Sequence, residues 1–204
     1  MAGPKSYYRT EIEGWQVEVS TALLNRDPAA ARQCLDLLRL QLTAIARHLP
    51  DVPLAELRRV PIQIGLSGVE GVLYHMASAS GAGVDNRDYV EIASARFFIR
   101  SSRHKPTVVL HELAHAFHER VLGDGNVLIH RAYLNALTHH LYERVARYDG
   151  RLVRAYALAS EREYFAELTE AYFGRNDTYP FTREELRIYD AAGLAMVRTV
   201  WGAP

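Results

Sequence analysis

Two histidines and a glutamate lie within five residues in a pattern that can bind and use a metal ion. His111, Glu112 and His115 form the sequence H-E-x-x-H. On a helix, His111 and His115 are about one turn apart on the same face, so both imidazoles can bind one ion. Zn²⁺ in such a site polarises a bound water, and the adjacent Glu112 can take its proton. The apolar residues around this pattern predict a helix buried in the protein.

The third ligand of such a site must come from another segment. A catalytic zinc site has three protein ligands and an open fourth position. The extended pattern H-E-x-x-H-x-x-G-x-x-H is excluded, because positions 118 and 121 hold His118 and Val121. His118 lies one turn further along roughly the same face. However, three ligands in line on one helix cannot easily converge on one tetrahedral ion.

Glu163 and Glu167 are the best candidates to complete the site, because they are also four residues apart on a predicted helix. Glu163 can bind the metal. Glu167 can accept the outer N–H of a ligand histidine and so fix its tautomer. An alternative stays open, since Glu163 is also placed to cap a helix that begins after Ser160. Glu170 continues the same face, where a solvated or ion-paired role is favoured.

Other residues that could bind metal carry no comparable pattern. His75 lies at a predicted strand end and is favoured as a structural residue. His139 and His140 are helix neighbours that point in different directions, so they cannot form a ligand pair. The single cysteine, Cys34, excludes an intramolecular disulfide and a zinc site with several thiolates, and we expect it to be buried.

The elements that position these residues follow from periodicity and capping signals, and they predict an α+β fold. Strands and helices mix in the first half and the second half is all-helical, which favours α+β over a parallel doubly wound sheet. The length of 204 residues suits one domain over 1–204. Its lobes would span about 10–122 and 123–202, with a cleft between them. Strands are predicted over 15–19, 60–66, 72–76 and 89–99, a loop over 78–83, and helices over 28–49, 107–122, 127–148, 160–173 and 182–201.

Composition bounds the class of partner. The 204 residues carry 24 Lys plus Arg and 24 Asp plus Glu, so the formal net charge is zero. This balance argues against nucleic acid or an anionic membrane as the main partner. No stretch approaches the roughly 18 apolar residues of a membrane span. The first eight residues lack the apolar core of a signal peptide, so we expect a cytosolic protein or the mature part of an exported one.

With these residues in view, the chain resembles a known family. It is similar to the gluzincin metallopeptidases of the anthrax lethal factor catalytic-domain type, which include bacterial Pro-Pro endopeptidases. Their H-E-x-x-H is followed by a tyrosine and, seven residues later, by a glutamate within E-[FY]-F-A-E. The resemblance is firm over about 89–201 and rests on layout alone over 15–76. The matching residues are His111, Glu112, His115, Tyr156, Glu163 and Glu167.

The resemblance implies a zincin-like metallopeptidase fold and a zinc-dependent endopeptidase that holds one Zn²⁺ and acts on a peptide or protein substrate. His111, His115 and Glu163 would be the zinc ligands, and Glu112 the general base that later protonates the leaving amine. Tyr156 would donate a hydrogen bond to the oxyanion. Glu167 would support a ligand histidine from behind.

In metallopeptidases of this architecture the strand before the metal helix, here 89–99, forms the upper rim of the cleft. An extended peptide could pair with such an edge. The alternative for 89–99 is an ordinary interior strand of the sheet. Two alternatives stand beside this reading. One is a zinc-binding protein of the same fold without turnover. The other is a zinc hydrolase that acts on a non-peptide substrate.

Overall fold

A five-stranded mixed sheet forms the first half of the protein. The computed structural model describes residues 6–67, 69–77 and 87–203, so the loop predicted over 78–83 lies outside the described residues. The strands are β1 (Tyr7–Ile12), β2 (Trp15–Ser20), β3 (Ile62–Ile64), β4 (Val72–His75) and β5 (Tyr89–Ile92). Their order is β1-β2-β3-β5-β4, with antiparallel outer pairs and parallel inner pairs. The predicted α+β class is confirmed.

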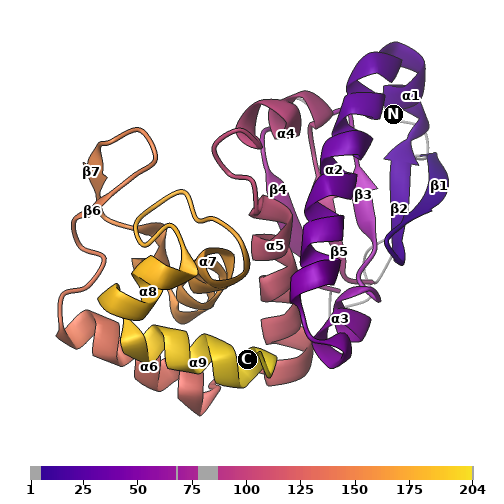
Figure 1. Ribbon diagram of the computed structural model, residues 1–204. Helices are drawn as coiled ribbons and strands as arrows, with labels where there is room; N and C mark the ends of the chain where they lie inside the picture. Colours follow the sequence, from indigo (N-terminus) through magenta and orange to yellow (C-terminus); the bar gives the residue numbers. More distant parts are fainter. Residues whose placement is uncertain (1–5, 68, 78–86, 204) are drawn as a thin grey trace.

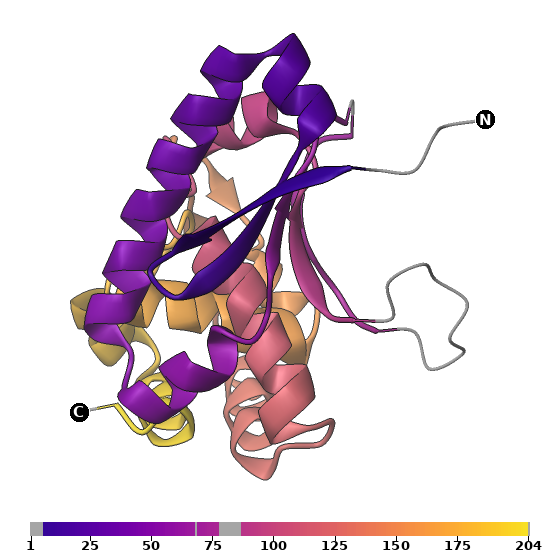
Figure 2. The ribbon, with the colours of Figure 1, turned by 90° about the vertical axis from the view of Figure 1, so that its right-hand side faces the viewer.

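Helices pack on one face of this sheet and continue through the second half of the chain (Figures 1 and 2). The first-half helices are α1 (Thr21–Arg26), α2 (Pro28–His48), α3 (Asp51–Leu57) and α4 (Ala95–Ser101). They are followed by α5 (Val108–Phe117), the π-helical turn η1 (His118–Leu122), α6 (Val127–Thr138), strands β6 (Val145–Ala146) and β7 (Leu152–Val153), the 3-10 turn η2 (Tyr156–Leu158), α7 (Glu161–Phe173), α8 (Arg183–Tyr189) and α9 (Ala191–Trp201). Among the described helices, none combines the length and apolar character that a bilayer crossing requires.

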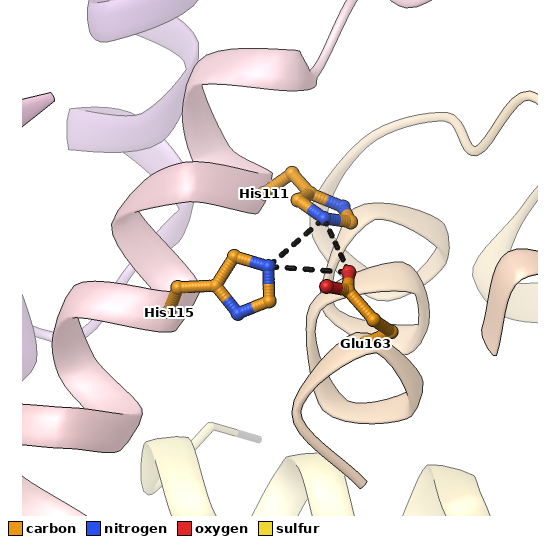
Figure 3. A group of neighbouring side chains, drawn as sticks. All are labelled: His111, His115 and Glu163. Carbon is orange, nitrogen blue, oxygen red and sulfur yellow. Dashed lines mark hydrogen bonds and ion pairs between the residues drawn. The ribbon is translucent and has the colours of Figure 1, made fainter. Parts of the chain in front are cut away.

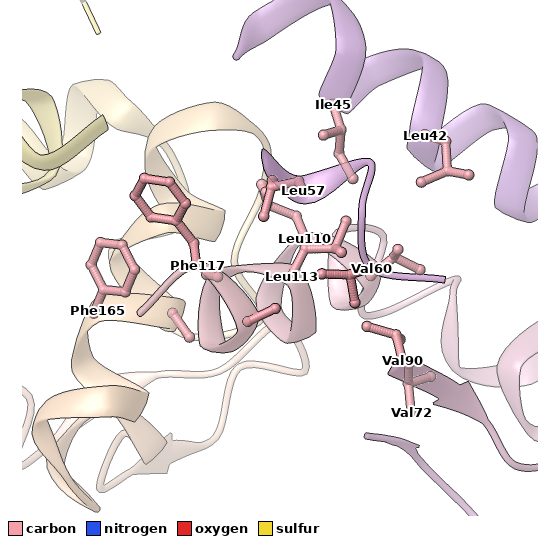
Figure 4. Close-up of a cluster of buried hydrophobic side chains, with 14 of the residues drawn as sticks. Leu42, Ile45, Leu57, Val60, Val72, Val90, Leu110, Leu113, Phe117 and Phe165 are labelled. Atoms are coloured by element: carbon pink, nitrogen blue, oxygen red, sulfur yellow. The ribbon is translucent and has the colours of Figure 1, made fainter. Parts of the chain in front are cut away.

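The inward face of the sheet is a layer of β-branched side chains in register. Val17, Ile62 and Val90 pair across β2, β3 and β5, and all three are fully buried. α2 and α5 pack near this layer, and burial of each large aliphatic side chain contributes about 1.5–3 kcal/mol. Figure 4 shows part of this core, including Leu42 and Ile45 of α2 and Leu110 and Leu113 of α5.

α5 is the central helix, with the sheet on one side and α7 on the other (Figure 1). Leu113 and Ala116 are fully buried, and the Phe117 ring stacks on Trp201 of α9 with the ring centroids 4.3 Å apart. The buried helix predicted from its apolar residues is therefore present. The helix predicted over 107–122 changes to the π-helical turn η1 at its end.

The strand predicted over 89–99 is wrong in its second half. β5 ends and α4 follows, because the Ser94 side chain caps α4 by accepting a hydrogen bond from the Phe97 N–H at 3.3 Å. The buried residues Ala95 and Phe98 are three apart, which is helical spacing. β5 is also an interior strand, so the edge strand that packs beside α5 is β4 instead.

The second half is not all-helical as predicted. The helix predicted over 127–148 ends as α6 at Thr138, because His140 and Tyr142 adopt positive φ angles of 54° and 68° that no helix can continue. The chain then forms the small antiparallel pair β6–β7 before it reaches η2.

The last predicted helix, 182–201, is two helices. Thr182 and Glu185 form the predicted capping box at the start of α8. Asp190 then leaves the helical conformation and caps α9, accepting a hydrogen bond from the Gly193 N–H at 2.8 Å. Its buried carboxylate also accepts hydrogen bonds from the Tyr142 and Tyr164 hydroxyls. The contact with Tyr164 ties the start of α9 to α7.

Candidate metal centre

His111, His115 and Glu163 meet between α5 and α7 (Figure 3). The His111 Nε2 lies 3.1 Å from the His115 Nε2 and 3.0 Å from the Glu163 Oε2. The third side of this triangle, from the His115 Nε2 to the Glu163 Oε2, measures 3.2 Å. The three residues that the spacing predicted as a group are thus brought together, from positions 52 residues apart in the chain.

Local structure explains why these side chains point at one another. His111 and His115 lie one turn apart on α5, as expected for i and i+4 positions. At the start of α7, the Ser160 side chain accepts a hydrogen bond from the Glu163 N–H at 3.2 Å. Ser160 therefore caps the helix, and the Glu163 carboxylate is directed to the two imidazoles rather than back to the helix end.

The three atoms fit one metal ion. Zinc–nitrogen and zinc–oxygen bonds of about 2.0–2.1 Å at tetrahedral angles place neighbouring ligand atoms about 3.3 Å apart, close to the separations found here. The ligand set of two imidazoles and one carboxylate is one that Zn²⁺ accepts. The His115 and Glu163 side chains are 16% and 18% exposed, which leaves a side of the group open for a fourth ligand.

A second group of potential ligands lies behind His111. It consists of the His111 Nδ1 with the carboxylates of Glu167 and Glu170, and all three residues are buried. The His111 Nδ1 is only 2.7 Å from the Glu170 Oε1, a hydrogen-bond distance that uses this nitrogen as a donor. We therefore favour the group of His111, His115 and Glu163 as the metal site.

Glu170, rather than the predicted Glu167, receives the outer N–H of His111. The nearest Glu167 oxygen lies 3.9 Å from the His111 Nδ1, beyond hydrogen-bond distance. Glu170 is 5% exposed and pairs with His111, so the ion-paired role predicted for it is confirmed and the solvated role is wrong. Its other oxygen lies 2.6 Å from the Thr107 hydroxyl, which precedes α5. The contact fixes which His111 nitrogen is left for a metal.

Glu167 serves a neighbouring buried network instead. Its Oε2 accepts hydrogen bonds from the Asn176 side-chain amide at 3.1 Å and the Thr178 hydroxyl at 3.2 Å. Burial, reinforced by the nearby Glu170 carboxylate, raises the pKa of Glu167 to about 7. This carboxyl group therefore connects α7 to the segment before α8. It lies close to His111 but makes no hydrogen bond to it.

The Glu112 carboxylate lies next to the edge strand. It is 8% exposed, and its Oε2 accepts a hydrogen bond from the main-chain N–H of Tyr74 in β4 at 2.8 Å. Burial raises the pKa of Glu112, and this outweighs the lowering by His111, His115 and the Tyr74 amide. A carboxylate with a raised pKa is better matched to accept a proton near neutral pH.

The predicted tyrosine also reaches the centre. Tyr156 lies in η2, just before α7, and 57% of the residue is exposed. Partial burial, the Glu163 carboxylate and the Glu112 carboxylate raise the pKa of the phenol. Tyr156 is therefore a neutral O–H donor near the Glu163 carboxylate.

The charges of the ligands are strongly coupled. Burial alone would lower the pKa of His111, but hydrogen bonds and charge from Glu163 and Glu170 raise it well above its usual range. Burial would raise the pKa of Glu163, but hydrogen bonds from His111 and His115 hold it far below its usual range. The carboxylates around His111 therefore favour a positive charge at this position.

The other histidines stay outside the centre. His118 belongs to neither group of potential ligands among the described residues. His75 lies 2.9 Å from the Glu91 carboxylate and stacks on Tyr89, which confirms its structural role. The sequence reasoning missed the Tyr74 amide and the roles of Thr107 and Glu170. For Glu170 a signal existed, since it continues the helix face of Glu163.

No protein-family model, curated protein or solved structure matches this chain. The functional argument therefore depends on the residues of the chain itself and on their geometry.

Proposed function

We propose that this protein is a zinc-dependent endopeptidase with a zincin-like fold. The observation that carries the proposal is the convergence of His111, His115 and Glu163 at 3.0–3.2 Å, with Glu112 beside them. The order of these residues along the chain, and the position of Tyr156, support the resemblance to the lethal factor type of gluzincin.

The side chains divide the chemistry of peptide hydrolysis between them. Zinc, when bound by the three ligands, lowers the pKa of a water molecule and polarises a carbonyl group. Glu112 takes a proton from the attacking water and delivers it to the leaving amine. Because it is buried and its pKa is raised, both transfers are feasible near neutral pH. His111 is kept in the required tautomer by Glu170.

Tyr156 stabilises the negative charge that develops on the carbonyl oxygen. A neutral phenol can donate a hydrogen bond to this oxygen more strongly in the transition state than in the ground state. Its exposed position in η2 leaves it free to meet a substrate. The raised pKa of Tyr156 keeps the donor proton in place at the pH of the reaction.

The edge strand that fits an extended substrate is β4, not the predicted strand 89–99. β4 is the last strand of the sheet and packs beside α5, which carries the base and two of the ligands. A peptide could pair with its outer edge by main-chain hydrogen bonds, while side-chain contacts give specificity.

The test is cleavage of a diverse peptide library, mapped by mass spectrometry with wild type and Glu112→Ala side by side. We expect cuts with wild type alone and equal zinc content in both proteins. Cuts by both proteins would contradict the role of Glu112. Tight zinc binding without cuts of peptides or proteins would favour the alternatives, a silent zinc protein or a hydrolase of another substrate.

A further inference from the structure

The edge strand β4 contacts the centre through its main chain. The Tyr74 N–H donates to the Glu112 Oε2 at 2.8 Å. The contact joins a strand of the sheet to the one side chain of α5 that is proposed to act as base. It is not part of the H-E-x-x-H pattern and depends on the position of β4 alone.

The pairing of β4 with β5 explains why this amide is free to reach Glu112. In an antiparallel pair, residues alternate between those that bond to the partner and those that face away. The Gly71 carbonyl accepts from the Ala93 N–H, so the main-chain groups of Leu73 and His75 also face β5. Tyr74 lies between Leu73 and His75, so its main-chain groups face away from β5. Its N–H therefore points to the outer edge, where Glu112 lies.

Glu112 depends on this donor for its orientation. The carboxylate is 8% exposed, so little water is available to solvate it. A buried carboxylate that loses a hydrogen-bond donor becomes costly and turns to other donors. One such alternative would be either ligand histidine, and that contact would compete with metal binding.

We propose that the main-chain amide of Tyr74 is a positioning group that holds Glu112 by its Oε2 and so leaves the Oε1 to exchange protons with water and the leaving amine. The inference rests on the proposed function, because it treats Glu112 as the base. It adds that the base is aligned by the sheet rather than by α5 alone. Tyr74 acts through Glu112 and its side chain is not required.

A pair of substitutions separates the amide from the side chain. Tyr74→Ala keeps the N–H, whereas Tyr74→Pro removes it. Proline is tolerated on edge strands where the missing N–H does not belong to the ladder. Relative to Tyr74→Ala, we expect Tyr74→Pro to lower kcat about 10-fold or more, with KM and zinc content little changed. An unchanged kcat would overturn the inference. A raised KM with unchanged kcat would also overturn it, because the amide would then bind substrate.

Hydrogen exchange of the Tyr74 amide tests the same contact without catalysis. In the zinc-loaded protein and after zinc removal, NMR should show this outward amide protected in wild type. Loss of a bond to a charged group should make exchange about 10-fold faster or more in Glu112→Ala. Glu163→Ala is the matched control in the metal-free protein, because it removes a proposed zinc ligand and leaves the Glu112 carboxylate that accepts from the Tyr74 N–H; the protection should remain.

The two measurements keep this inference distinct from the proposed function. An unprotected Tyr74 amide in wild type overturns the inference even if the protein cuts peptides. A protected amide in a wild type that cuts no peptide or protein refutes the proposed function, and with it the role of Tyr74 in aligning a base. If Tyr74→Pro does not fold, the exchange rates of wild type, Glu112→Ala and Glu163→Ala still decide whether the contact exists.

Discussion

Replacement of Glu170 by glutamine should weaken zinc binding more than the same change at Glu167. Glu170 lies 2.7 Å from the His111 Nδ1, and both side chains are buried. Glutamine can keep a neutral hydrogen bond to this nitrogen but loses the charge that makes the imidazole a better ligand. Removal of such a partner typically costs 10- to 100-fold in metal affinity, which is about 1.4–2.8 kcal/mol.

The matched control is Glu167→Gln, because the nearest Glu167 oxygen lies 3.9 Å from the same nitrogen. We expect its zinc affinity to stay within about threefold of wild type, since it breaks no hydrogen bond to a ligand. Thr107→Val, which removes a neighbour of the Glu170 Oε2 at 2.6 Å, should fall between the two.

Competition of each variant with a fluorescent zinc chelator gives the dissociation constants. Thermal unfolding of the metal-free proteins shows whether the fold is intact. A larger loss of affinity in Glu167→Gln than in Glu170→Gln would refute the assignment of Glu170. It would mean that Glu167, as the family resemblance implies, supports the ligand histidine.

Three further predictions concern the same centre. Tyr156→Phe should lower kcat about 100-fold with zinc content unchanged, and equal kinetics would remove the phenol from the mechanism. Zinc binding at pH 7 should release about one proton, because the pKa of His111 is raised above its usual value without metal and a ligand imidazole must be neutral. Calorimetry in buffers of different ionisation enthalpy measures the number of protons released. A release of zero protons would contradict the raised pKa. Glu167→Gln should stabilise the metal-free protein at pH 8 by up to about 3 kcal/mol and have little effect at pH 5. The fold raises the pKa of this carboxyl group from 4.5 to about 7, so its ionisation costs stability only as the pH rises through this range. Urea unfolding measures the effect at both pH values, and equal effects would contradict the reasoning.

Local sequence patterns could predict the parts of the centre that one helix determines. The spacing of His111 and His115 sets both imidazoles on one face of α5, whatever the rest of the fold does. Ser160 and Glu163 mark the start of α7 in the same way. The packing of α5 against α7 is a tertiary contact. The sequence indicated it only because His111 and His115 on one helix, and Glu163 and Glu167 on the other, share the same four-residue spacing.

Helix geometry makes Glu170 as plausible a partner for His111 as Glu167, but it does not choose between them. At 100° per residue, a residue seven positions after Glu163 is offset by about 20°, whereas Glu167 is offset by about 40° in the other direction. Both therefore lie near the Glu163 face, and only the crossing of α5 over α7 decides which one reaches His111. The choice of Glu167 followed the shorter spacing and not the geometry of the helix pair.

The order of the strands in the sheet could not be predicted from the alternation of apolar and polar residues. The observed order moves the proposed substrate-binding edge from the strand predicted over 89–99 to β4. The apolar run over 89–99 is typical of a strand, but Ser94 caps a helix within it. Alternation says which side chains share a face and not which strand lies outermost. β4 takes the edge because the chain returns antiparallel beside β5. β1 was also missed, although Gly14 with a φ of 87° marks the tight turn that pairs it with β2.

The arrangement of charge around His111 explains why the centre should be more stable with a metal ion than without one. Four carboxylates, those of Glu112, Glu163, Glu167 and Glu170, lie around two histidines in a poorly solvated region. Without a cation, protons must offset this negative charge, which is why the pKa of His111 rises. A divalent ion would replace those protons and join α5 to α7. A zinc ion that binds only the folded state, at 100 times its dissociation constant, would stabilise the fold by about 2.7 kcal/mol.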